Sequence, residues 1–167
     1  KDFEKAFSLY EKAAVGGYID AQINVAFLYI SGRGVKKDMK KAVIMCRVSS
    51  DEQAKGYSLD VQLESLTRHC IREDIEIVKH YKEDHSAKNF NRPEFKKFME
   101  FAKSNKGEVD LLLITSWDRF SRNLTDSLIM LRRLKEMGID VHAIEQPIDM
   151  SIPENKAMLA LFLAIPE

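Results

Sequence analysis

The sequence has few cysteines, no long apolar run and no excess charge, and each absence narrows the class of protein. Cys46 and Cys70 lack the spacing of a metal site, so we expect reduced thiols in a cytoplasmic protein, with Cys46 filling the core. No apolar run reaches the roughly 18 residues that a membrane-spanning helix needs. The charged start KDFEKAF does not have the pattern of a signal peptide, so no membrane partner is expected.

Charge is balanced, with 26 basic and 26 acidic residues. Overall charge therefore gives no argument for nucleic acid as a partner, and any such argument must come from local placement. The chain has 167 residues, of which 45% are hydrophobic, which predicts one globular domain, alone or with a small appendage. Because it does not begin with Met, we expect a piece of a longer protein.

The first 38 residues have helical periodicity. Residues 2–14 and 20–30 carry apolar side chains at helical spacing, and glycines at 16–17, 32 and 34 end the two helices, which predicts a helical hairpin. Three residues, Asp2, Lys5 and Ala6, recur 36 positions later as Asp38, Lys41 and Ala42. A period of this length is typical of helical repeats. The repeat pattern stops abruptly near residue 38.

The pattern of KAFSLYEKAA, the spaced alanines and SGRGVKKD resembles a Sel1-like repeat, a relative of the tetratricopeptide repeat. The resemblance implies a protein partner for residues 1–38. A hairpin that only packs, or one joined by fusion, is an equal alternative, because a single repeat cannot bury its faces. We place the boundary between residues 38 and 39, with a second domain over 39–167.

From residue 39 onward, strands and helices alternate. Apolar strands are predicted over 42–48, 75–81, 109–114 and 139–144, and helices over 58–72, 93–104, 124–137 and from 154. This βα order predicts an α/β fold with a mostly parallel sheet and helices on both faces. The last helix is apolar on all sides, so it is either buried or half of a subunit interface, and the chain ends inside it.

Polar side chains follow two of these strands. Arg47 and Ser49 end strand 42–48, and the stretch TSWDRFSRN follows strand 109–114. Carboxyl ends of parallel strands meet at one edge of a sheet, where ligands bind. Arg47 and Ser49 are two apart and face the same side of an extended strand. In the second stretch, Arg119 and Arg122 are three apart and share a face of a helical turn, next to Asp118.

One hydroxyl and three arginines at one edge indicate phosphate chemistry, in which guanidinium groups bind the phosphate and stabilise its added charge. The alternatives are a turn or cap role for Ser49 and a surface ion pair between Asp118 and the arginines.

Over about residues 40–167 the sequence resembles the catalytic domain of the serine recombinases. The resemblance rests on three motifs in this order: CRVSSDEQ, the spacing from Ser86 to Arg92-Pro93, and TSWDRFSRN. That family comprises resolvases, invertases and large serine integrases, and GYSLDVQ and RPEF are similar to the large type. The resemblance implies that Ser49 attacks a DNA phosphodiester and forms a 5′-phosphoserine link. It also implies double-stranded DNA as partner, a dimer and a synaptic tetramer, and no metal, ATP or other cofactor.

Further roles follow from the same resemblance. Asp118 would hold the arginines and is a candidate to protonate the leaving 3′-oxygen. Gln53 and Gln62 would position the nucleophile loop, with a solvated helix face as the alternative for Gln62. Asp110 matches another family acid, or serves only strand entry.

The acidic loop, Glu83-Asp84-His85-Ser86-Ala87, departs from the family pattern D-x-x-S-G, because its Asp-to-Ser spacing is one residue shorter and alanine replaces glycine. Asp84 is our choice for its acid, with Glu83 as the alternative, and Ser86 matches the family serine. His85 is taken as a loop histidine and not as a general base.

A further family arginine and the DNA-binding domain would lie beyond residue 167, so we expect this piece to be inactive alone. The competing hypothesis is a Sel1-like interaction module on a catalytically silent recombinase scaffold. Convergence of Ser49 with the arginines would separate the two.

Overall fold

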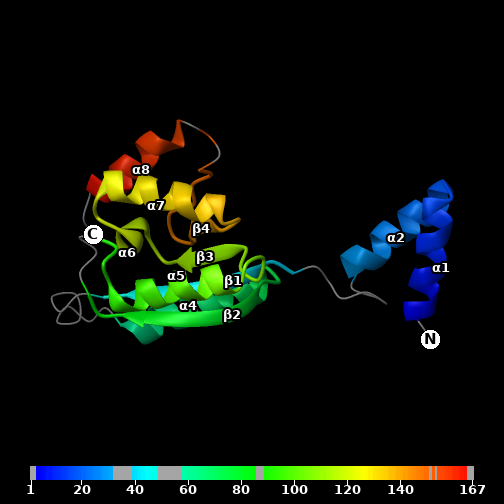
Figure 1. The fold of residues 1–167 in the computed structure, drawn as a ribbon, viewed down its shortest axis with the longest axis horizontal. Helices are drawn as coiled ribbons and strands as arrows, with labels where there is room; N and C mark the ends of the chain where they lie inside the picture. The colour runs from blue at the N-terminus through cyan, green and yellow to red at the C-terminus, as the bar shows by residue number, and fades with distance from the viewer. Residues whose placement is uncertain are drawn as a thin grey trace. The chain divides into compact units, whose positions relative to one another are not determined.

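The structure, a computed structural model, describes residues 3–31, 39–48, 58–85, 89–150, 152 and 154–164. The chain divides into two compact units, Lys1–Met39 and Lys40–Glu167, which are described separately (Figure 1). Among the described residues no helix is both long enough and apolar enough to cross a membrane.

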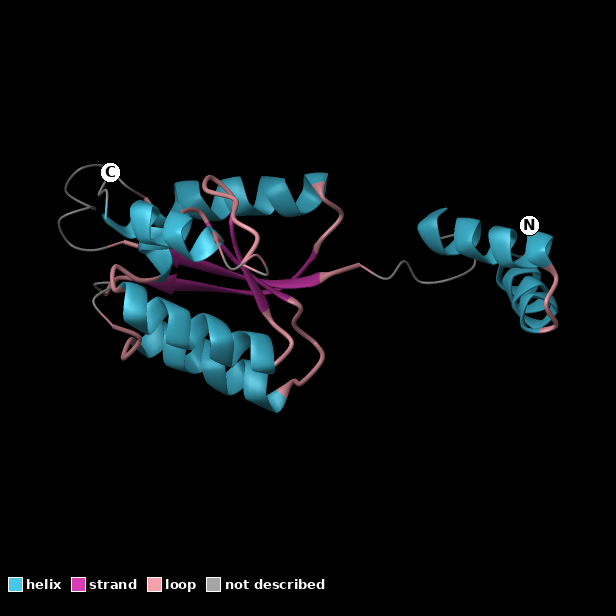
Figure 2. Cartoon of the chain, turned by 90° about the horizontal axis from the view of Figure 1, so that it is seen from above, coloured by secondary structure: helices cyan, strands magenta, loops and turns pink. Residues whose placement is uncertain are grey.

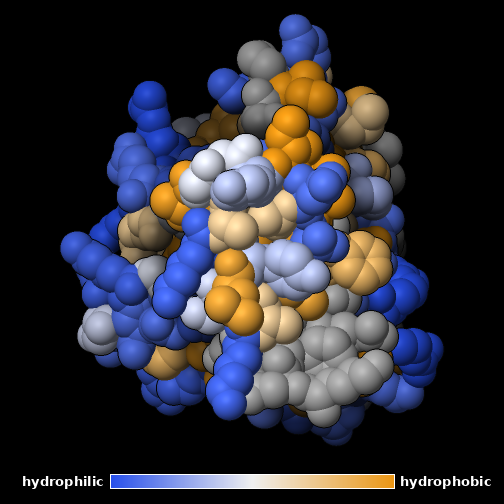
Figure 3. Space-filling model, turned by 90° about the vertical axis from the view of Figure 1, so that its right-hand side faces the viewer, coloured by the Kyte–Doolittle hydropathy of each residue, from blue (hydrophilic) through white to orange (hydrophobic). Residues whose placement is uncertain are grey.

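The first unit is a helical hairpin, as the sequence predicts. Helix α1 spans Phe3–Val15 and α2 spans Ile19–Ser31. Gly17 makes the tight turn between them at φ +88°, a conformation that strongly favours glycine. Most apolar side chains of the hairpin are exposed, and Ala21 alone among those described is buried. Figure 3, a space-filling view of the chain, shows hydrophobic side chains open to solvent among hydrophilic ones.

The second unit is built on a parallel sheet. Its strands are β1 (Lys41–Arg47), β2 (Glu76–Glu83), β3 (Leu111–Ile114) and β4 (Asp140–Ala143), in the order β2-β1-β3-β4. All three pairings are parallel, which confirms the predicted sheet. The central strands are apolar and buried on both faces, as parallel strands require. The register of β1 with β2 shifts between Ala42 and Val43.

Helices cover both faces of this sheet (Figure 2). On one face α4 (Leu59–Arg72) buries Leu66 and Cys70 against the even-numbered residues of β1. On the other, α5 (Pro93–Ser104) and α7 (Leu124–Glu136) pack against Val43, Met45 and the facing residues of β3 and β4. Alternate side chains of one strand thus enter two separate apolar clusters.

Two elements near the carboxyl edge differ from the prediction. The four-residue helix α6 (Trp117–Phe120) follows β3 and was not predicted. Helix α8 (Asn155–Ala164) buries Leu159 in the core, but Met158 and Leu161 stay about half exposed. Within the described chain, α8 is therefore buried along one side only.

Candidate active site at the carboxyl edge of the sheet

Three chain segments meet where the parallel strands end. Strand β1 ends at Arg47, β2 ends at Glu83, and α6 begins three residues after the end of β3. Because β1, β2 and β3 run parallel, these ends lie at one edge of the sheet. The predicted meeting of Arg47 with the TSWDRFSRN stretch is therefore observed.

Arg47 is fully buried between the ends of β2 and β3. Its Nη1 donates to the carbonyl of His85 at 3.3 Å, and its Nη2 donates to the carbonyl of Asp118 at 3.4 Å. Nη2 also lies 3.8 Å from Asp118 Oδ2. A buried guanidinium needs such partners, and they fix its position before any ligand arrives.

Asp118 lies between two arginines. Its Oδ2 is 3.2 Å from Arg119 Nη2, and its Oδ1 accepts a hydrogen bond from Ser116 Oγ at 2.5 Å. Arg119 is also buried and donates from Nη1 to the carbonyl of Arg47 at 3.4 Å. The three side chains form a compact, net positive cluster, which suits an anionic ligand such as a phosphate group.

Gln62 holds the end of β1 from helix α4. Its Oε1 accepts from the backbone N–H of Arg47 at 3.1 Å, and its Nε2 donates to the carbonyl of Arg47 at 2.9 Å. The residue is 8% exposed. The alternative of a solvated helix face for Gln62 is therefore wrong, because the amide points inward to the strand.

Arg92 is a buried member of this region that the sequence analysis left without a role. Its Nη2 donates to the carbonyl of Phe120 at 2.8 Å and its Nη1 to that of Arg119 at 3.4 Å. The guanidinium lies 5.2 Å from the ring centres of Phe90 and Phe95. Burial, together with nearby Arg47, lowers the pKa of Arg92 to about 10. Arg92 thus fixes the end of α6. In the sequence, its position directly before Pro93 was the feature that could have drawn attention to it.

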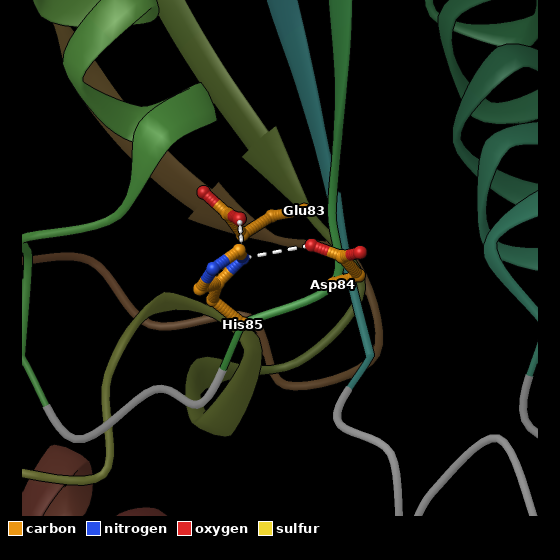
Figure 4. Close-up of side chains that lie close together, drawn as sticks. All are labelled: Glu83, Asp84 and His85. Carbon is orange, nitrogen blue, oxygen red and sulfur yellow. Dashed lines mark hydrogen bonds and ion pairs between the residues drawn. The ribbon is translucent and has the colours of Figure 1, made fainter.

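The acidic loop places its two carboxylates differently (Figure 4). Glu83 is buried, and its Oε2 accepts from the backbone N–H groups of Glu94 and Phe95 in the first turn of α5. The side chain of Asp84 is 70% exposed and contacts His85. The structure brings Glu83, and not Asp84, into the buried region around Arg47 and Arg92. Among the described residues, Glu83, Asp84 and His85 are the one group close enough to share a metal ion.

Asp110 lies at the opposite edge of the sheet. Its Oδ2 accepts from the backbone N–H of Lys41 at 2.7 Å, at the start of β1. The six residue steps along β1 from Lys41 put Arg47 roughly 20 Å away, at about 3.3 Å per step. Asp110 is therefore not at the candidate site, and the strand-entry alternative describes its contact.

Arg122 does not share a helical turn with Arg119. Helix α6 ends at Phe120, and Ser121 has extended backbone at φ −162° and ψ 154°. Ser121 Oγ accepts from the backbone N–H of Asn123 at 3.1 Å, which stabilises this turn instead of another helical one. That premise of the sequence analysis is wrong, and Arg122 itself is exposed.

Three predicted residues, Ser49, Gln53 and Ser86, lie outside the described residues. The last described residue before Ser49 is Val48, whose backbone N–H donates to the carbonyl of Glu83 at 3.0 Å. The chain thus enters residue 49 from a fixed position beside Arg47.

Comparison with known proteins agrees with this fold. Residues 42–167 match the family model described as resolvase, N-terminal domain. The transposon Tn552 resolvase of Staphylococcus aureus is 32% identical over 87 residues, which cover 50% of this chain and 42% of that protein. The chain therefore spans less than half the length of that curated relative.

Two solved structures are similar in fold. A resolvase family site-specific recombinase from Streptococcus pneumoniae is 31% identical with a TM-score of 0.59, over 75% of this chain and 84% of that one. The N-terminal catalytic domain of TP901-1 integrase has a TM-score of 0.61 at 24% identity, over 75% of this chain and 92% of that one. The match over 42–167, together with the parallel sheet, shows that the chain belongs to the resolvase family and carries its N-terminal, serine recombinase catalytic domain.

Proposed function

We propose that this chain is the catalytic domain of a protein that cuts and rejoins DNA in site-specific recombination through a covalent 5′-phosphoserine intermediate on Ser49. The observation that carries the proposal is the fixed cluster of Arg47, Asp118 and Arg119 at the edge where the chain leads into Ser49. Buried arginines held by backbone carbonyls and one carboxylate suit binding of a scissile phosphate.

In the proposed reaction, Ser49 Oγ gives its proton to solvent and attacks phosphorus, and the bond from phosphorus to the 3′-oxygen breaks. The 3′-oxygen leaves as a hydroxyl after taking a proton, for which Asp118 is the candidate donor. One phosphodiester replaces another, so the bond energy is retained and neither ATP nor a metal is required. Attack by a 3′-hydroxyl on the phosphoserine reverses the step and joins a new pair of strands.

Supporting roles are assigned by position. Gln62 fixes the backbone of Arg47, and Arg92 fixes α6, so both position residues that would contact the phosphate. We propose Glu83 for the acidic-loop role in place of Asp84, because Glu83 is buried beside the arginines. Gln53 and Ser86 in the nucleophile and acidic loops, and Arg122 as a third phosphate-binding arginine, complete the proposed site.

Beyond this domain, we propose that the whole protein binds double-stranded DNA, acts as a dimer and synaptic tetramer, and resembles the large serine recombinases. Residues 1–38 are proposed as a Sel1-like repeat that contacts a protein partner, supported by the exposed apolar side chains of the hairpin. We further propose that residues 1–167 alone do not recombine DNA.

The test uses the chain extended beyond residue 167 and a nicked suicide DNA substrate that carries its target site. A covalent protein–DNA band on a denaturing gel is expected, and it should disappear in Ser49→Ala. Ser50→Ala is the matched control and should retain the band. If Ser49→Ala forms the band as well as the native protein, Ser49 is not the nucleophile. Absence of any band with a verified target site would favour a silent scaffold.

A further inference from the structure

Three consecutive side chains at the end of β2 converge on one point (Figure 4). His85 Nδ1 lies 2.7 Å from Asp84 Oδ1 and 2.9 Å from Glu83 Oε1. All three potential ligand atoms lie within 4.8 Å of one another. This group contains two carboxylates and an imidazole.

The two oxygens of the buried Glu83 carboxylate have different surroundings. Its Oε2 accepts from the N–H groups of Glu94 and Phe95, whereas its buried Oε1 has no hydrogen-bond partner among the described residues. Oε1 is close to His85 Nδ1, but that contact is not a well-aligned hydrogen bond. A buried carboxylate oxygen that lacks a partner costs free energy, so a cation at this point would be favourable.

A proton on His85 cannot satisfy both carboxylates. A single Nδ1–H group points along one direction, and its hydrogen-bonding geometry fits Asp84 Oδ1. Glu83 Oε1 would then stay without a donor. A divalent cation has no such directional limit and can accept lone pairs from all three atoms together.

We infer that Glu83, Asp84 and His85 form a binding site for a divalent transition-metal ion of the zinc type. One nitrogen and two carboxylate oxygens match the ligands that Zn²⁺ takes, and a fourth position is left for solvent. Imidazole disfavours Mg²⁺ and Ca²⁺, which prefer oxygen alone. Ligands about 2.0–2.2 Å from a tetrahedral Zn²⁺ lie roughly 3 to 3.5 Å apart, so the observed contacts need to open only slightly.

The side chains that must move are free to do so. Those of Asp84 and His85 are 70% and 56% exposed, whereas Glu83 is held in place by α5. An ion here would also fix the backbone, because the carbonyl of His85 accepts from Arg47 and that of Glu83 accepts from Val48. A bound ion would thus stabilise the chain beside the arginine cluster, and neither its binding nor the test below depends on the proposed reaction.

Calorimetric titration of the chelator-treated chain with Zn²⁺ alone tests the inference. One ion per chain should bind with a micromolar dissociation constant, and Co²⁺ should bind with the visible absorption of a tetrahedral site. His85→Ala and Asp84→Asn should each weaken Zn²⁺ binding by at least about ten-fold. The matched controls, His80→Ala and Glu76→Gln, change exposed residues of the same strand and should bind as the native chain does.

Two results would overturn the inference: no saturable Zn²⁺ binding, or equal binding by His85→Ala, Asp84→Asn and the controls. Glu83→Gln is a weaker test, because it also disturbs the first turn of α5. The buried thiol of Cys46, whose pKa is raised by burial to about 12, stays protonated and does not compete. Because no DNA is used, failure here leaves the Ser49 assay unaffected.

Discussion

Among single residues, Gln62 has a task that few side chains can perform. It accepts from the N–H and donates to the carbonyl of the same residue, Arg47. An amide side chain offers an acceptor oxygen and a donor nitrogen side by side, and this arrangement uses both. The backbone at the end of β1 is thereby fixed from α4.

Gln62→Glu should therefore destabilise the fold. A carboxylate can still accept from the Arg47 N–H, but it cannot donate to the Arg47 carbonyl and it adds a buried charge. We expect the free energy of unfolding in urea to fall by about 1–3 kcal/mol. Glu64→Gln, an exposed position on the same helix, should change it by less than about 0.5 kcal/mol. Equal effects would show that the two backbone contacts carry no stability.

The burial of Cys46 leads us to expect that the free energy of unfolding decreases at alkaline pH. The ordinary pKa of this thiol is 9.0, and burial raises it to about 12 in the folded chain. Because the pKa is higher in the folded chain, the thiol of the unfolded chain ionises first as the pH rises. The contribution of the protonated Cys46 thiol to the free energy of unfolding is therefore complete below pH 9 and is lost between about pH 9 and pH 12.

The free energy of unfolding should fall with pH in this range by at most about 1.4 kcal/mol per pH unit, and Cys46→Ala should remove this pH dependence. Urea unfolding of both proteins across this pH range is the measurement. Parallel pH profiles for the two proteins would contradict the assignment.

Among the elements, α6 is positioned from outside itself. It has four residues, and Arg92 binds the carbonyls of Arg119 and Phe120 at its end. A helix this short gains little from its own hydrogen bonds, so its orientation depends on such contacts. Asp118 and Arg119 belong to α6, so the positions of their side chains depend on how this helix is oriented.

Arg92→Lys should reduce covalent complex formation on the suicide substrate by more than ten-fold while the chain stays folded. A lysine ammonium keeps the charge, but it lacks the planar fork that reaches two carbonyls and packs against the Phe90 and Phe95 rings. Arg68→Lys, on the exposed side of α4, should leave the yield unchanged. The positioning role would be refuted if Arg92→Lys cleaved DNA at the native rate.

These elements also show what the sequence could and could not predict. Helix α5 has the predicted bounds, because Pro93 marks its start and apolar residues recur at helical spacing. Helix α6 was missed because four residues cannot display a helical period. The inward direction of Gln62 and Glu83 was not decided either, because it depends on partners distant in sequence. Residue type favours the surface for both.

For the whole molecule, the two apolar clusters of the described residues consist of side chains from Ala42 onward. We therefore expect the second unit to form its core without the hairpin, and residues 40–167 to fold alone. We expect the midpoint of thermal unfolding to stay within about 3 °C of that of the full chain, which corresponds to roughly 1 kcal/mol. Calorimetry of the two proteins measures this. A much larger drop would mean that the hairpin stabilises the catalytic unit.

The outer strand β2 has a consequence for self-recognition. On its outer side β2 pairs with no other described strand, and such an edge can pair with a strand of another chain, as in amyloid growth. Five of its eight residues are charged or histidine, and its register with β1 is irregular near Ala42. At the other border, β4 has only four residues. Neither edge strand of the described sheet is well suited to pair with a strand of another chain. We therefore expect any self-association of this unit to use its helical surfaces.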